Sequence, residues 1–138
     1  MWAELQRALA RFPDAVLTGL DADGRPAGAR CRPRADASAE VLRCAAPPGL
    51  HLVDGPASLL CHGHDAELWS LRSFVARGAL VVDGAEWVFT PTALTMGNGM
   101  GGPVSDLRVF VAARQRAGRY LARRGIARPA IQWARLRP

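Results

Sequence analysis

The chain has 138 residues, of which 49 % are hydrophobic and 22 % are charged, and this composition excludes a disordered or collagen-like protein. Its length suits a single domain over residues 1–138. All 18 basic residues are arginine and 12 residues are acidic, so the net charge is +6. Such a chain attracts anions, but charge alone does not choose between nucleic acid, an acidic partner and a phosphorylated small molecule.

Cysteine usage and hydropathy indicate the compartment. Cys31, Cys44 and Cys61 form an odd set without C-x-x-C spacing, which favours reduced thiols over a disulfide framework. The first residues lack the apolar run of a signal peptide. No segment approaches the ~20 apolar residues that span a bilayer. We therefore expect a cytoplasmic protein with no membrane partner.

The first predicted elements are a helix and a β-hairpin. A helix is expected over residues 2–12, because apolar side chains recur every three or four positions, and Pro13 ends it. A strand over residues 15–20 follows. The Asp-rich turn at residues 21–24 ends in Gly24, which suits a left-handed backbone.

The return strand of this hairpin carries Arg30, Arg32 and Arg34 at two-residue spacing. In a continuous strand this spacing places all three guanidinium groups on one face. Guanidinium forms charge-assisted, bidentate bonds with phosphate and carboxylate groups. The strand therefore predicts an anion clamp, and the alternative is a solvated face in an arginine-rich chain.

The remaining elements favour an antiparallel barrel. Strands are expected at 40–44 and 57–62, with a turn or short helix at 64–71. A second hairpin has strands at 74–82 and 86–90 around Asp83-Gly84, and Pro91 opens a brief helical stretch. A helix over 103–124 ends at Gly125, and a tail covers 126–138. Six short strands joined mostly by hairpins do not fit βαβ units.

Three other features have alternative interpretations. On a strand, His62 and His64 would point the same way, as the ligands of a metal site do. No second ligand cluster supports such a site. We therefore treat both histidines as candidate polar contacts or proton donors in a cleft. The glycine-rich loop at 97–102 precedes a helix and favours a flexible connector over an anion site. Arginines of the last helix indicate a solvated face, with a nucleic-acid surface as the alternative: Arg108, Arg114, Arg116, Arg119, Arg123 and Arg124.

Several segments resemble one known family. The hairpin VLTGLDADGRPAGARCRP, the segment GPASLLCHGHDAELWSLRSFVARGAL with its Arg77-Gly78 pair, and the tail YLARRGIARPAIQW resemble short actinobacterial members of the pyridoxamine 5′-phosphate oxidase-like, FMN-binding split-barrel superfamily. The resemblance implies a mainly β fold, a six-stranded antiparallel split β-barrel of Greek-key type with N- and C-terminal helices. It also implies a homodimer with FMN between the subunits, whereas F420 or haem occurs in other relatives.

The resemblance also implies site residues. Arg30 and Arg32 would face the flavin, and Arg43 and Cys44 would line its isoalloxazine ring. Where the oxidases have a serine and basic residues that hold the phosphate, this chain has Ala45-Ala46-Pro47-Pro48-Gly49, and the oxidases' R-x-H motif is absent.

The expected function is therefore a flavin-dependent oxidoreductase of a small molecule, and pyridoxamine phosphate oxidase activity is not expected. One alternative is a non-catalytic split-barrel module that binds a cofactor or another ligand. A lower-ranked alternative is a basic nucleic-acid-associated protein.

Overall fold

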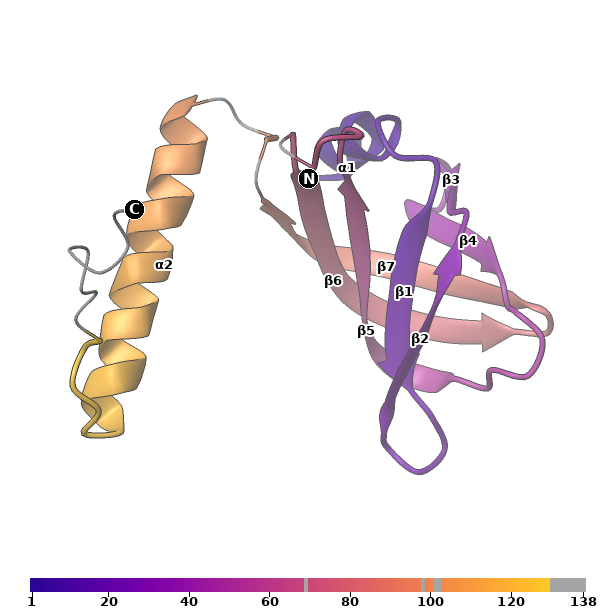
Figure 1. Ribbon diagram of the computed structural model, residues 1–138. Coiled ribbons are helices and arrows are strands. Elements are labelled where there is room, and N and C mark those ends of the chain that lie inside the picture. The colour runs from indigo at the N-terminus through magenta and orange to yellow at the C-terminus, as the bar shows by residue number, and fades with distance from the viewer. Residues whose placement is uncertain (69, 98, 101–102, 130–138) are drawn as a thin grey trace.

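The computed structural model describes residues 1–129 except Trp69, Asn98, Gly101 and Gly102. Two helices flank seven antiparallel strands, so the prediction of a mainly β fold is confirmed (Figure 1). In chain order the elements are α1 (Trp2–Leu9), β1 (Ala15–Leu20), β2 (Pro26–Cys31), β3 (Arg34–Asp36), β4 (Val41–Ala45), β5 (Val53–Gly63), β6 (Arg72–Asp83), β7 (Glu86–Met96) and α2 (Pro103–Arg123).

The strands form one sheet with the order β2-β1-β5-β6-β7-β4-β3. The two edge strands, β2 and β3, are consecutive in the chain and are separated by only Arg32 and Pro33. The sheet therefore curls until its two edges approach each other, which makes it a half-barrel (Figure 1). We call the place where the edges meet, residues 30–34, the seam.

The seam corrects the predicted strand count from six to seven. The arginine-bearing return strand is interrupted: β2 ends at Cys31, and Arg34 begins β3 at the opposite edge of the sheet. Pro33 lacks the N–H that a continuous ladder needs, and the chain crosses between the edges there. The prediction that Arg30, Arg32 and Arg34 share one face of one strand is therefore wrong.

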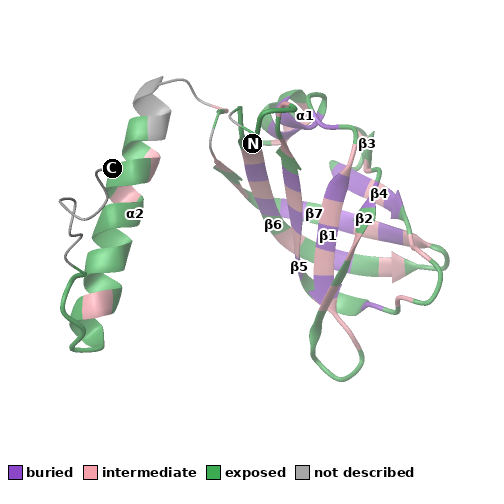
Figure 2. Cartoon of the chain, viewed as in Figure 1, coloured by how far each residue is buried: buried purple, intermediate pink, exposed green. Residues whose placement is uncertain are grey.

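The core lies inside the curl of the sheet, where alternate strand residues are buried (Figure 2). The largest fully buried side chains are Trp87, Phe74 and Phe89. Helix α1 joins this core through a buried apolar face, and Phe12 packs edge-on against Phe74 with ring centroids 5.5 Å apart. The helix ends at Leu9, earlier than the predicted residue 12, and Phe12 belongs to the turn that follows.

Strand β7 is longer than predicted, because it continues through Pro91 to Met96 where a helical stretch was expected. A bulge at Arg77 and Gly78 shifts the register opposite Pro91, so the ladder accommodates a residue without an N–H. Gly78 is required at this point, since a Cβ there would collide with the carbonyl oxygen of Thr90. The described residues of 64–71 form turns instead of a helix.

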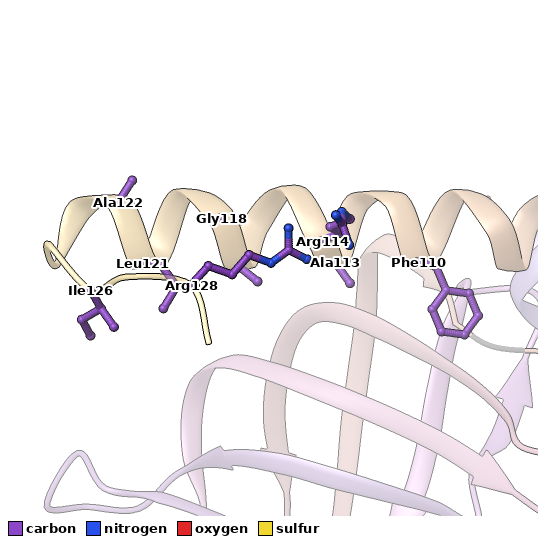
Figure 3. A pocket seen from close by; sticks show the side chains of 9 residues that line it. Phe110, Ala113, Arg114, Gly118, Leu121, Ala122, Ile126 and Arg128 are labelled. Carbon is purple, nitrogen blue, oxygen red and sulfur yellow. The ribbon is translucent and has the colours of Figure 1, made fainter. Parts of the chain in front are cut away.

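Helix α2 confirms the helix predicted at 103–124, and it ends at Arg123, just before the turn at Gly125, which has a φ of 62°. Its apolar side is exposed: Leu107 is 64 % and Phe110 is 70 % accessible. A groove of about 620 Å³ runs along the helix, between it and the chain at Ile126 and Arg128 (Figure 3). The predicted tail lies outside the described residues from position 130 onward, as do parts of the loop at 97–102.

In the part of the chain that the structure describes, neither helix combines the length and apolarity that a membrane span requires.

Candidate anion-binding site

A shallow pocket of about 770 Å³ lies at the seam. We call it the arginine pocket, and six residues line it: Asp14, Arg30, Cys31, Arg32, Arg34 and Ala45. The strand alternation of β2 turns Cys31 into the core and leaves Arg30 exposed. Arg32 lies in the link and Arg34 begins β3, so curling of the sheet brings three arginines together that do not share a strand.

The arginines of the pocket are only partly neutralised. The Nε of Arg32 lies 3.0 Å from Oδ1 of Asp14, and an Nη of Arg34 lies 2.6 Å from Oε1 of Glu86. Within the described residues, no carboxylate pairs with Arg30. The side chains of Arg32 and Arg34 are 84 % and 73 % exposed, so water screens both pairs and a ligand competes with them easily.

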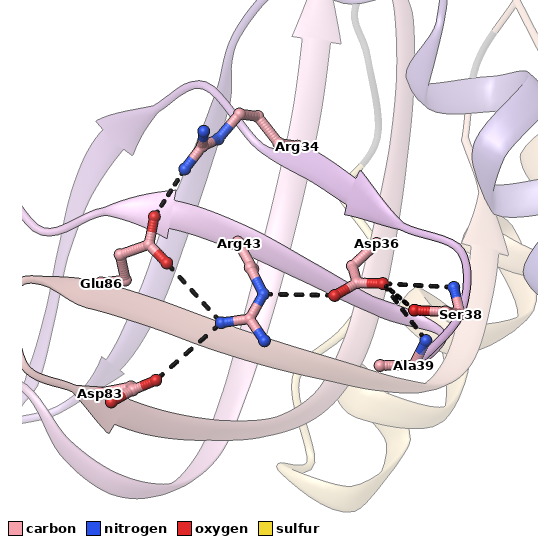
Figure 4. Close-up of polar contacts among 7 residues, drawn as sticks. All are labelled: Arg34, Asp36, Ser38, Ala39, Arg43, Asp83 and Glu86. Carbon is pink, nitrogen blue, oxygen red and sulfur yellow. Dashed lines mark hydrogen bonds and ion pairs between the residues drawn. The ribbon is translucent and has the colours of Figure 1, made fainter.

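Arg43, which the resemblance places beside a flavin ring, lies in an ion-pair network and does not line the arginine pocket (Figure 4). Its Nε lies 3.4 Å from Asp36, and one Nη lies 3.7 Å from Glu86 and 4.0 Å from Asp83. These three carboxylates and Arg34 complete the network. Because Arg43 is half-buried among acidic partners, it is poorly placed to hold an anion.

Asp36 anchors this network to the turn between β3 and β4. Its carboxylate accepts hydrogen bonds from the Ser38 hydroxyl at 2.7 Å and from the N–H groups of Ser38 and Ala39. The Ser38 hydroxyl first, then the Ala39 N–H and the Arg43 guanidinium, lower the pKa of Asp36. The carboxylate therefore stays ionised and holds Arg43 in place.

Two cysteines meet at the base of the arginine pocket. The Sγ atoms of Cys31 and Cys44 are 3.2 Å apart and share a hydrogen bond. When Cys31 is ionised, Cys44 donates this bond to the thiolate, which lowers the pKa of Cys31, and an N–H from the backbone of Leu17 adds to the effect. The same contact and burial raise the pKa of Cys44, while burial raises the pKa of Cys61 to about 12.

Cys31 is 7 % exposed and lines the pocket, whereas Cys44 and Cys61 are fully buried. Cys44 was predicted to line a flavin ring, but its thiol reaches Cys31 and not the surface.

The two candidate histidines have different surroundings. His62 lines a small cavity of about 20 Å³ together with Asp14, Val16 and Arg30, directly beside the arginine pocket. His64 lies beyond the end of β5, and its Nδ1 is 2.7 Å from the carbonyl oxygen of Asp65. Of the two candidate histidines, His62 therefore lies in a strand near the arginines, whereas His64 follows the strand.

Two residues of the pocket were missed by the sequence analysis. Asp14 precedes β1 and gave no local signal, because its partner Arg32 reaches it only after the hairpin has formed. Cys31 stands between two arginines in the sequence. The alternation of side chains along a strand is the signal that would have placed its thiol on the inner face, opposite to Arg30. From the segment at 45–49, only Ala45 lines the pocket, and the next N–H, of Ala46, is bonded to the carbonyl of Ala85 at 2.8 Å.

No protein-family model matches this chain, and no curated protein matches it significantly. The resemblance to the split-barrel superfamily therefore stays a prediction that depends on the sequence segments quoted above.

Proposed function

We propose that this half-barrel is a split barrel that binds FMN with its phosphate in the arginine pocket, and that it acts as a flavin-dependent oxidoreductase on a small molecule. The observation that carries the proposal is the convergence of Arg30, Arg32 and Arg34 around one pocket at the seam. Phosphate is dianionic near neutral pH and accepts several charge-assisted hydrogen bonds at once.

The residues present fit the phosphate group. Arg30 has no carboxylate partner among the described residues, so it needs to break no ion pair to meet an anion. Arg32 and Arg34 have exposed partners and can exchange them for phosphate oxygens. These arginines would replace the serine and basic residues that the family uses, where this chain has Ala45.

An apolar wall lies beside the arginines. Val16 of β1 pairs in register with Arg30 on one side and with Leu60 of β5 on the other. Both apolar side chains are half-buried, on the face of the sheet away from the core. A planar ring system that extends from a phosphate near Arg30 would pack against these side chains.

Bound flavin supplies hydride or electron transfer, while the protein supplies binding, orientation and proton control. His62 is the candidate for proton control, because its imidazole lies beside Arg30 and Asp14 and an imidazole can accept or donate a proton. His64 is a weaker candidate, since its ring nitrogen is engaged with the carbonyl of Asp65.

We further propose a homodimer in the reducing cytoplasm. Helix α2 exposes apolar side chains that include Leu107, Phe110 and Val111. No other described part of the single chain buries them, and exposed apolar patches of this kind are typical of protein–protein contacts. A second copy would cover them and would enclose the open pocket. Sedimentation analysis is expected to give twice the chain mass of 14.8 kDa, and a monomer would contradict the proposal.

The direct test of the function is the visible absorbance of the purified protein, before and after addition of FMN or F420. We expect a flavin spectrum that the protein retains on gel filtration. If the protein retained F420 but not FMN, the pocket would still be a flavin site, and F420 would replace FMN as the proposed cofactor. A colourless protein that retains neither would refute the proposal.

A non-catalytic ligand-binding module is the second candidate. It is favoured by the chemistry of the pocket lining, because the one carboxylate among the described lining residues, that of Asp14, is already paired with Arg32. The two candidates differ in turnover: a module of this kind would bind flavin but would not accelerate its reduction by a nicotinamide donor.

A further inference from the structure

We propose that Cys31 and Cys44 form a redox-active dithiol at the base of the arginine pocket. In this proposal Cys31 attacks an anionic small-molecule disulfide, such as oxidised glutathione, and Cys44 resolves the mixed disulfide. The proposal rests on the pocket and its thiols and does not require that flavin binds.

The geometry favours bond formation between these two sulfurs. Their Sγ atoms are 3.2 Å apart, so an approach of about 1 Å brings them to disulfide length. Cys31 ends β2 and Cys44 lies in β4, so the bond would join strands from the two edge regions of the sheet. It would therefore close the seam covalently.

The two thiols differ in how far they are exposed to the arginine pocket, and this difference gives them different roles. Cys31 is the cysteine that lines the arginine pocket, whereas Cys44 lies fully buried behind it. A small disulfide can therefore reach Cys31 first. Cys44 then meets the resulting mixed disulfide from inside the core, where it already contacts Cys31. Cys61 is also fully buried and does not line the pocket, so it serves as an internal control.

Charge favours an anionic reactant. Arg30, Arg32 and Arg34 surround Cys31, and Asp14 is the opposing carboxylate, itself paired with Arg32. Oxidised glutathione carries several carboxylates that these guanidinium groups attract. The hydrogen bond from Cys44 favours the thiolate form of Cys31, which is the attacking species.

The reaction balances in two steps. The Cys31 thiolate attacks one sulfur of oxidised glutathione, forming a mixed disulfide as the glutathione S–S bond breaks and one glutathione thiolate leaves. Cys44 then attacks Sγ of Cys31 and forms the Cys31–Cys44 bond, while its proton passes to the second glutathione, which leaves as the thiol. The two cysteines are oxidised by two electrons, and oxidised glutathione is reduced to two glutathione molecules.

The test treats reduced, full-length, ligand-free protein with oxidised glutathione and follows its intact mass and peptide map. We expect the loss of two hydrogens and a Cys31–Cys44 cross-link. Cys44→Ser should stop at a glutathione adduct on Cys31, and Cys61→Ser should behave like wild type. The Arg30→Ala, Arg32→Ala double variant should react roughly tenfold more slowly with oxidised glutathione, but unchanged with the neutral bis(2-hydroxyethyl) disulfide.

Three results would overturn the proposal. The first is a folded wild-type protein that stays reduced while its urea-unfolded form oxidises. The second is a glutathione adduct on Cys61 in preference to Cys31. The third is a folded Cys44→Ser variant that acquires no glutathione adduct on Cys31. Since no flavin is added, none of these outcomes depends on the proposed cofactor.

Discussion

The arginine pocket and the network around Arg43 adjoin each other, share Arg34, and use arginine in opposite ways. Among the described residues of the pocket lining, three arginines meet one carboxylate, that of Asp14. In the network, Arg34 and Arg43 meet three carboxylates. The difference teaches that an arginine is available to a ligand where acidic partners are few or exposed, and is held in place where several half-buried carboxylates surround it.

The largest expected effect comes from replacing two of the arginines that line the pocket. Arg30→Ala combined with Arg32→Ala should weaken FMN binding about 100-fold, because two charge-assisted hydrogen bonds contribute about 1.5 kcal/mol or more each. Fluorescence titration of FMN measures this change. Arg25→Ala is the matched control, since Arg25 is an exposed arginine of the β1–β2 turn that pairs with Asp23. Wild-type affinity in the double variant would refute the clamp.

The second prediction concerns pH, because the pocket holds an ionisable thiol and the network does not. A lowered pKa keeps Cys31 ionised below the pH at which an ordinary thiol protonates, and its reactivity disappears as the pH falls through that lowered pKa. Asp14, Arg30, Arg32, Arg34 and the two other cysteines are the titratable or charged groups around it.

Cys44→Ala removes the hydrogen-bond donor, so the pH profile of Cys31 alkylation by iodoacetamide should move to higher pH. Mass spectrometry of the alkylated peptides gives the profile. Cys61, with its pKa raised to about 12, should remain unlabelled in the folded protein across the neutral range. An unchanged pH profile in the Cys44→Ala variant would show that the contact with Cys44 does not lower the pKa of Cys31.

The third prediction tests the network as a structural element. Arg43→Ala should lower the free energy of unfolding by about 1–2 kcal/mol, because it leaves half-buried carboxylates without their shared cation. FMN affinity should stay within about twofold of wild type. Urea unfolding gives the stability, and Arg32→Ala, an exposed pair, should cost less than about 0.5 kcal/mol. Weaker FMN binding at unchanged stability would reverse the roles assigned to the two regions.

The smallest expected effect comes from removing the ion pair that Arg34 forms with Glu86, so that Arg34 can turn from the network to the pocket. Glu86→Gln removes the carboxylate charge that Arg34 contacts at 2.6 Å, so Arg34 becomes freer to meet a phosphate. FMN should bind about two- to threefold more tightly in this variant, as expected for loss of one screened, exposed ion pair. Weaker binding in the same titration would mean that Glu86 positions Arg34 for the ligand.

Local chemistry predicted much of the fold. The apolar run at residues 15–20 predicted β1, the Asp-Gly turn predicted the β6–β7 hairpin, and Gly125 predicted the end of α2. Pro33 and Pro91 caused the main errors, since a proline breaks one strand at the seam and is absorbed by a bulge in another. Sequence spacing does not distinguish these two outcomes, because the bulge depends on the partner strand.

The site was predicted less completely than the fold. Arg30 and Arg32 were named from spacing, although the spacing argument assumed one unbroken strand. Two of the three carboxylates around Arg43, those of Asp83 and Glu86, come from the distant β6–β7 hairpin. Asp14 reaches Arg32 across the first hairpin. Such partners depend on how the sheet curls, and no local pattern encodes that.

The measurement that most directly tests the central claim is the ratio of FMN to riboflavin affinity on the wild-type protein at low salt. The two ligands share the ring system and differ in the phosphate. If the arginine pocket holds that phosphate, FMN should bind about 100-fold more tightly, and added salt should reduce the advantage. Equal affinities for FMN and riboflavin would contradict the account.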